Sequence, residues 1–265
     1  TIFIFAMSRI GGRDPREMYM SENISGREAW EALGREMGLD RPLPVQYGIW
    51  LGGISKGDFG TSVKHQRNAM DLVLERLPAT LQLAAGAFVF TILVGLPLGV
   101  LSAVKRGTLF DYVGRAFALG GQAMPGFWLG IVLIIVFAVY LDLLPTGRRG
   151  GLDHYILPSV ALGWSTAAGL LRLLRSSMLE VLDSEFIKLA RAKGVSNRLV
   201  IWKHALRNAL IAPLTYAGLL MAAFLTGTVV TEQVFAWPGI GRLAIVSVLN
   251  NDFPIMAATM MLFTL

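Results

Sequence analysis

Three stretches of this 265-residue chain carry no charged side chain and are long enough to cross a lipid bilayer as helices. They are residues 77–104, 116–141 and 208–231, and residues 155–171 form a shorter fourth stretch. The hydrocarbon core of a bilayer is about 30 Å thick, which corresponds to about 20 apolar residues in a helix. The chain is therefore predicted to be an all-α polytopic membrane protein.

The composition excludes several other classes of protein. Only 16% of the residues are charged, whereas soluble domains carry about 25%. The chain has no cysteine and three histidines, which excludes thiol catalysis and cysteine-ligated metals and leaves little for a histidine metal site. We therefore expect neither a soluble enzyme nor a metal centre.

Apolar fragments at the two ends extend the pattern to six spans. Residues 1–8 and 253–265 are too short to cross a bilayer alone, so we interpret them as parts of a first and a sixth helix that are incomplete here. The complete spans are expected at about 79–104, 113–141, 157–178 and 208–231.

The polar segment after the first span is too long for an unstructured loop. We expect residues 1–13 to end the first transmembrane helix, residues 14–76 to form an ordered extracytoplasmic cap, and residues 77–265 to form the transmembrane domain. Within the cap, a short helix is predicted over Arg27–Met37 and a second ordered segment over Val45–Ile54.

The basic residues of the connecting segments indicate the orientation. Residues 105–115 and 172–207 fall on one side of the membrane and hold eleven basic residues against four acidic ones. Because short cytoplasmic loops are enriched in Lys and Arg, that side is assigned to the cytoplasm. The net charge of +6 is then a consequence of topology, and we expect contact with membrane lipid but none with nucleic acid.

Small residues and prolines within the spans predict closely packed and bent helices. The pairs Gly95–Gly99 and Gly126–Gly130 are spaced to let helices approach, and Pro97 allows a bend. Packing is the favoured interpretation, and the alternative is a path between helices whose width changes. The residues that would line such a path are Gln122, Met124, Pro125, Ser165, Thr166, Thr226 and Thr228.

Ionisable residues add two expectations. Glu232, at the outer end of the fifth span, could form an outer gate or could simply cap the helix, and we favour the structural role. Essentially no ionisable residue lies in the middle of a predicted span. This disfavours coupling to a proton gradient.

The inward-side connection contains a recognisable helical pattern. Glu180–Lys193 is predicted to be helical and to end at Gly194, and Ser196 is predicted to begin a second helix. Ala190 and Gly194 lie one turn apart beside basic side chains, which fits docking into a groove on another protein. The alternative is an amphipathic hairpin that rests on anionic lipid.

The same residues carry a resemblance to a known family. Glu185–Gly194 followed by His204–Pro213 resembles the EAA loop of permease subunits of binding-protein-dependent ABC importers, in the B-type variant of the dipeptide, oligopeptide and nickel group. Other landmarks of that subunit follow in order along the chain, at Leu39–Tyr47, Gly57–Ser62, Arg76–Leu81, Met124–Gly130, Leu144–Gly147, Phe235–Gly241 and Asn251–Pro254.

This resemblance makes residues 179–207 a cytoplasmic coupling loop. This chain departs from the general family at Lys188 and Leu189, where the family's loop has Glu and Ala. Of the family's Glu-Ala-Ala, only the final alanine is kept, at Ala190. The resemblance assigns contact with an ATPase to Glu185, Phe186, Lys188, Leu189, Ala190, Arg191, Ala192, Lys193, Gly194, Val195 and Ser196.

The resemblance implies a type I ABC importer transmembrane domain in a prokaryotic inner membrane. It implies a second homologous permease, two ABC ATPases that bind ATP and Mg, and an extracytoplasmic substrate-binding protein as partners. The chain has no Gly-x4-Gly-Lys-Ser/Thr loop of its own and is expected to be non-catalytic and to bind no cofactor. The expected cargo is small peptides. Alternatives are nickel chelates, glutathione, opines or oligosaccharides, or an ATP-independent channel.

Overall fold

The computed structural model describes residues 39–264 except residue 63, together with residues 2, 5, 6, 31, 34 and 35. Across that part of the chain every regular element is a helix, which confirms the predicted all-α class. The chain forms two compact units, one of Thr1–Pro78 with Pro238–Leu265 and one of Ala79–Trp237. The helix predicted over Arg27–Met37 and the expected end of the first span lie outside the described residues, apart from the single positions above.

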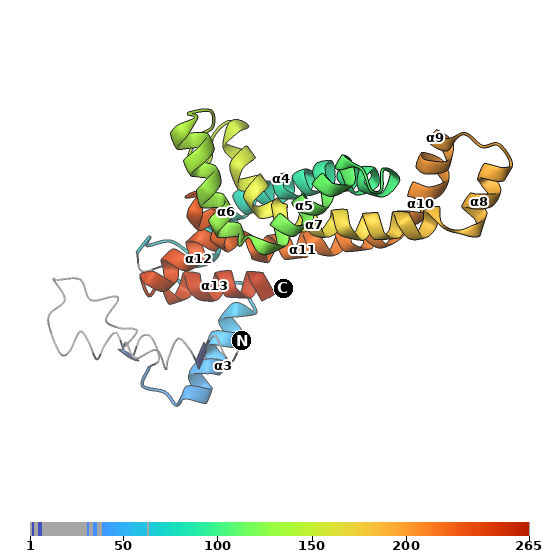
Figure 1. The fold of residues 1–265 in the computed structure, drawn as a ribbon. Helices are drawn as coiled ribbons and strands as arrows, with labels where there is room; N and C mark the ends of the chain where they lie inside the picture. Colours follow the sequence, from blue (N-terminus) through green and yellow to red (C-terminus); the bar gives the residue numbers. More distant parts are fainter. Residues whose placement is uncertain are drawn as a thin grey trace. The chain divides into compact units, whose positions relative to one another are not determined.

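The larger unit is built around helix α7 (Asp153–Leu182). Helices α5 (Leu109–Ala123), α6 (Gly126–Leu133) and α11 (Ile211–Val234) pack against α7. The π-helical segment η2 (Ile134–Tyr140) continues α6. Figure 1 shows α6 and the hairpin of α8 and α9 at opposite ends of the long helices.

Two helices are long and apolar enough to cross a membrane by themselves: α4 (Ala69–Val104) and α7. Two pairs of helices, each bent at a short break, are also long and apolar enough if each pair is counted as one span. The four predicted spans correspond to these two helices and these two pairs. The last apolar segment forms the short helix α13 (Phe253–Thr264).

The span predicted over residues 113–141 is sharply broken. Leu109–Ala123 and Gly126–Tyr140 meet at an angle of 109°, and Pro125 is the residue that precedes the second helix. Pro97, by contrast, lies within α4, which remains helical throughout. The proline at the break removes a backbone donor, but a proline alone does not force a helix to end in this chain.

Glycines allow α4 and α7 to lie in close contact. A Cβ atom built on Gly95 would lie 3.0 Å from the carbonyl oxygen of Ala167, and one built on Gly99 would lie 3.1 Å from that of Leu171. Gly163 of α7 faces α4 in the same way, because its Cβ would lie 2.8 Å from the carbonyl oxygen of Ala87. The Gly95–Gly99 pair therefore has the packing role that was predicted for it.

Replacing Gly99 by valine is expected to lower the free energy of unfolding of the solubilised subunit by about 1–3 kcal/mol, because the added carbons would overfill the contact between α4 and α7. Unfolding by denaturant in detergent, followed by circular dichroism, measures the change. Gly218→Val in α11 is the matched control, because no atom of the residues that the structure describes lies within 4 Å of a Cβ built there. Equal losses in the two variants would contradict the packing role.

The smaller unit has its own apolar core. Val73 from α4, Ile240 from α12 (Ile240–Leu249) and Ile255 from α13 are fully or almost fully buried in it. Trp50 of α3 (Leu43–Ile54) packs against this cluster, and α3 is the second ordered segment that was predicted within the cap. The hydroxyl of Ser62 donates a buried hydrogen bond of 2.5 Å to Asp252, which links the segment before α4 to the segment before α13.

Candidate functional site

The inward-side connection folds as a compact helical hairpin. Helix α7 ends at Leu182 and α8 (Glu185–Ala192) begins after two residues, so the helix predicted over Glu180–Lys193 is interrupted. The interruption has a local cause, because the hydroxyl of Ser184 donates to the carbonyl of Val181 and competes with the helix. After Gly194 the chain returns through α9 (Asn197–Leu199), the π-helical η3 (Val200–Ala205) and α10 (Leu206–Ala209).

Gly194 ends α8 in a left-handed conformation, with φ +79°. The amide of Val195 donates to the carbonyl of Ala190 at 3.2 Å, and the amide of Gly194 donates to that of Arg191 at 3.0 Å. This pair of bonds is a Schellman motif, which favours glycine because other residues strain in this conformation. No atom of the described chain lies within 4 Å of a Cβ built on Gly194. Within this chain, glycine is therefore favoured at this position by the backbone conformation and not by a lack of space.

The hairpin has one buried face and one exposed face. Ile187 of α8 and Val200 of η3 are fully buried in a cluster with Val100 of α4 and Met178 of α7. Because this cluster joins the hairpin to the ends of two membrane helices, the hairpin cannot move independently of them without breaking apolar contacts.

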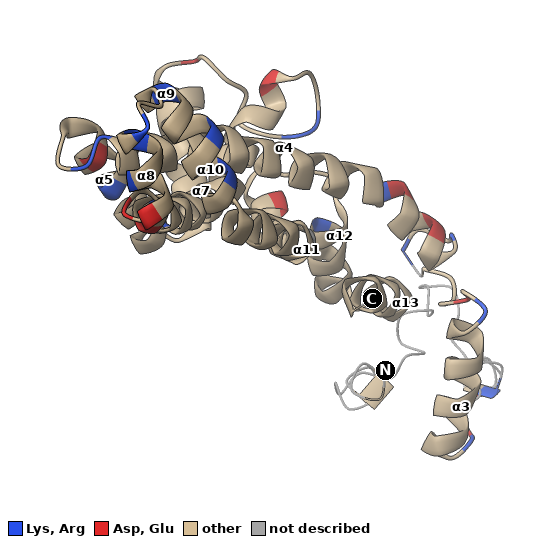
Figure 2. Ribbon diagram, turned by 90° about the vertical axis from the view of Figure 1, so that its right-hand side faces the viewer, with Lys and Arg blue, Asp and Glu red and all other residues tan. Residues whose placement is uncertain are grey.

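The exposed face of the hairpin combines apolar and basic side chains. Phe186 is 47% exposed and Leu189 is 56% exposed. Lys188 pairs with Glu185 at 2.8 Å, an exposed pair within one turn of α8. Figure 2 shows Lys and Arg gathered around α8, α9 and α10. The residues to which the family resemblance assigns ATPase contact are exposed on the hairpin, apart from the partly buried Ala190 and Val195.

A buried ion cluster links the hairpin end of α7 to the other inward-side connection. Asp111 of α5, only 2% exposed, accepts hydrogen bonds from Arg175 Nε at 2.9 Å, Ser102 Oγ at 2.7 Å and the amide of Gly107 at 3.0 Å. Arg115 lies 3.5 Å from the same carboxylate. Residues 105–115 and the hairpin therefore lie at the same end of the unit, as the charge pattern predicts.

The residues predicted to line a path between the helices do not all lie together. Ser165 and Thr166 of α7 line a cavity of about 320 Å3 between α6, α7 and α11. Gln122, Met124 and Pro125 lie at the break between α5 and α6 instead. On α11, Thr226 is exposed and Thr228 is fully buried, so these two threonines point to opposite faces.

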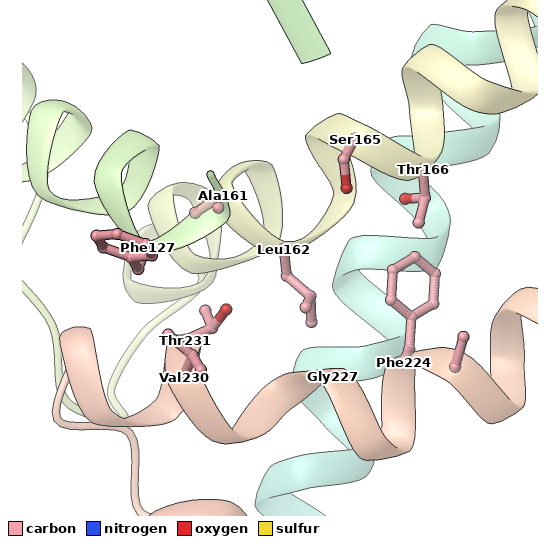
Figure 3. Close-up of a pocket in the computed structure, with 11 residues that line it drawn as sticks. Phe127, Ala161, Leu162, Ser165, Thr166, Phe224, Gly227, Val230 and Thr231 are labelled. Atoms are coloured by element: carbon pink, nitrogen blue, oxygen red, sulfur yellow. The ribbon is translucent and has the colours of Figure 1, made fainter. Parts of the chain in front are cut away.

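The same cavity is lined by residues that the sequence did not single out. Phe127, Gly227 and Thr231 contribute to its wall, and Figure 3 shows their side chains or backbone around the space below α7. Phe127 reaches the cavity because the break at Pro125 turns α6 back toward α7. A single sequence does not reveal the angle of that turn. An apolar residue within a span, such as Phe127, therefore cannot be recognised from the sequence as lining a cavity.

Glu232 is fully buried near the outer end of α11. It accepts a hydrogen bond of 2.7 Å from the hydroxyl of Thr80 in α4. Five residues further on, beyond the end of α11, the indole of Trp237 donates to the carbonyl of Ala79 at 2.8 Å. These contacts support a structural connection between α4 and α11, and the outer-gate role of Glu232 stays a prediction. No group of three or more metal-ligating side chains lies together among the described residues.

Comparison with known proteins identifies the chain's relatives. Residues 95–265 match the family of binding-protein-dependent transport system inner membrane components. The chain is 38% identical to the oligopeptide transport system permease protein AppB of Bacillus subtilis (strain 168), over 97% of this chain and 85% of that protein. It is 40% identical to the glutathione transport system permease protein GsiC of Pectobacterium atrosepticum, over 100% of this chain and 86% of that protein.

The fold also resembles solved transporter structures. A chain from the crystal structure of an amino acid ABC transporter with histidines superposes with a TM-score of 0.58 at 15% identity, over 73% of this chain and 86% of that one. At this identity the likeness concerns the fold alone. Together, the matched residues and the full-length relatives show that the chain belongs to the binding-protein-dependent transport system inner membrane components, as a multi-pass, non-catalytic permease subunit of a bacterial inner membrane.

Proposed function

We propose that this chain is the permease subunit through which an ATP-driven importer moves short peptides, glutathione included, into the cell. The observation that carries this proposal is the match to oligopeptide and glutathione permeases along 97–100% of the chain. Glutathione is itself a tripeptide, so both relatives act on one chemical class. Neither relative is named for nickel chelates, opines or oligosaccharides, and the proposal leaves these cargoes aside.

ATP is hydrolysed by partner ATPases in this proposal, and the hairpin of α8 and α9 conveys their movement. The exposed Phe186 and Leu189 would enter a groove on an ATPase, and the basic side chains beside them would meet its acidic rim. The buried face of the hairpin supports this role, because Ile187 fixes α8 to the ends of α4 and α7. Closure of the ATPases would then turn these helices as a rigid body.

The remaining partners belong to the same proposal. A second homologous permease would pack against this chain around a pseudo-two-fold axis, and a substrate-binding protein would dock on the outer face. The cavity that contains Ser165 and Thr166 would then form part of a path that opens alternately to the two sides.

Reconstitution tests the proposal directly. The chain is co-purified with its second permease and ATPases, placed in proteoliposomes, and supplied with the binding protein and radiolabelled trialanine or glutathione. We expect uptake of at least one of these peptides that requires both ATP and the binding protein. Uptake that continues without ATP would indicate a channel and contradict the proposal, as would a complex that imports neither peptide.

A further inference from the structure

The face of α7 that the other described residues leave uncovered is polar along its inner two thirds. Between residues 161 and 180, the exposed side chains are Ser165, Arg172, Ser176 and Glu180. Their spacing of seven, four and four places them on one side of a helix. The exposed side chains of α6 and η2, by contrast, are nearly all apolar, among them Phe127, Trp128, Ile131, Ile135 and Val139.

This contrast indicates which helix faces lipid. An arginine within a membrane helix is costly in hydrocarbon and is found facing protein or a water-filled cavity. Arg172 lies ten residues before the end of α7, so the helix continues past the residue at which the inward-side connection was expected to begin. The polar face of α7 therefore borders water or the second permease, and the exposed apolar side chains of η2 border lipid.

Arg172 lies between two cavities. The first, of about 350 Å3, is lined by Arg172, Arg115, Arg175 and Ser176 together with three apolar residues. The second, of about 420 Å3, is lined by Arg172, Gly169, Leu173 and Tyr216. Arg172 thus faces open space on the sides of both α5 and α11.

The charges around the first cavity do not balance. Its described lining holds three guanidinium groups and no carboxylate. Arg175 and Arg115 share the single carboxylate of Asp111, at 2.9 Å and 3.5 Å. Arg172 donates instead to the neutral Gln122, at 2.7 Å between Nη1 and Oε1. A site with this excess of positive charge, partly enclosed by apolar side chains, favours an anion.

We propose that Arg172, held by Gln122, is a carboxylate-binding position on the path of the cargo, with Tyr216 beside it. This inference rests on the proposed function, because a short peptide carries a terminal carboxylate. Ser165 lies seven residues earlier on the same face of α7, about 10 Å along the helix axis. A peptide that leaves the cavity at Ser165 and Thr166 would therefore meet Arg172 next on its way inward.

An anionic lipid headgroup offers this site a negative charge as a carboxylate does, so the test must separate the two sources. Because this chain has no cysteine, Ser176→Cys supplies its single thiol. The complex is placed in phosphatidylcholine vesicles, and the thiol is reacted with an anionic or a cationic methanethiosulfonate. We expect the anionic reagent to be favoured, and Arg172→Gln to lower that preference about tenfold.

Protection of the thiol identifies the occupant. Trialanine, delivered by its binding protein, is expected to slow the anionic reagent in phosphatidylcholine vesicles. Protection by added phosphatidylglycerol without peptide would assign the site to lipid and overturn the proposal. A thiol that neither reagent reaches would show that the second permease covers this face, and an unchanged preference in Arg172→Gln would show that Arg172 does not set the charge of the site. Each of these two results overturns the proposal.

Transport provides the second measurement. Arg172→Gln is expected to lower trialanine import about tenfold, and Arg172→Lys, which keeps the charge, is expected to lose less. Arg149→Gln, an exposed arginine in the outer connection, is the matched control and is expected to import normally. Equal import by wild type and Arg172→Gln overturns the inference while the proposed function stands. A wild-type complex that imports no peptide contradicts the proposed function instead.

Discussion

Replacing Gly194 by aspartate is expected to abolish peptide import and cargo-stimulated ATP hydrolysis while the subunit remains in the membrane. The backbone of Gly194 is left-handed, and the strain of an ordinary side chain there is about 1–2 kcal/mol. That strain alone would leave the hairpin folded, because Ile187 and Val200 stay buried. A Cβ built on Gly194 meets no atom of the described part of the chain within 4 Å. A complete loss of coupling would therefore arise from what covers the hairpin in the assembled importer.

The smaller unit supplies a matched control for this prediction. Gly57 follows α3 with φ +80°, its amide donates to Ile54, and the next amide donates to Gly53, so it forms the same motif as Gly194. Among the described residues, a Cβ built on Gly57 also meets no atom within 4 Å. Gly57→Asp thus carries the same local strain on the side assigned to the exterior, and we expect it to keep cargo-stimulated ATP hydrolysis.

Three measurements compare these two variants. Immunoblots of membranes give the amount of each subunit, phosphate release gives ATP hydrolysis, and radiolabelled trialanine gives import. If Gly194→Asp behaves like Gly57→Asp in all three, the strain of the turn is its only effect and the hairpin does not dock on an ATPase. Loss of both subunits from the membrane would instead mean that the left-handed turn is needed for folding.

The sequence predicts the membrane spans and their sides because both depend on composition averaged over many residues. Uncharged stretches of about 20 residues and an excess of Lys and Arg are such averages. They place residues 105–115 and the hairpin at one end, and Asp111 and Arg175 meet there. The turn at Gly194 is also predictable, because few residues other than glycine end a helix in that conformation.

The bends and the uncovered faces depend on tertiary contacts that a single sequence does not show. Pro97 and Pro125 are both prolines in apolar stretches, but only the second coincides with a break. Arg172 was counted with the inward-side connection, because it follows the uncharged stretch of residues 155–171. The helix continues past it because Leu171, Leu174 and Met178 give α7 a fully buried apolar face there. A single sequence also does not show which residue pairs with a given charged residue, since Asp111 and Arg175 are 64 positions apart.

Replacing Asp111 by alanine is expected to lower the free energy of unfolding of the subunit by about 3–5 kcal/mol. Removing one partner of a buried ion pair leaves the other charge without compensation, and this costs more than the pair itself contributes. Arg175 would lose both of its bonds to the carboxylate, while Ser102 and the amide of Gly107 would lose their acceptor. Denaturant unfolding of the purified subunit in detergent measures the change.

A double variant separates the loss of the ion pair from the loss of packing. If the unpaired guanidinium causes most of the damage, Asp111→Ala combined with Arg175→Met will be more stable than Asp111→Ala alone, because the remaining charge is removed. The exposed pair Arg67–Glu75 is the control, and Glu75→Ala is expected to change stability little because water already solvates both groups. A loss in Asp111→Ala no larger than in Glu75→Ala would mean that water reaches the cluster.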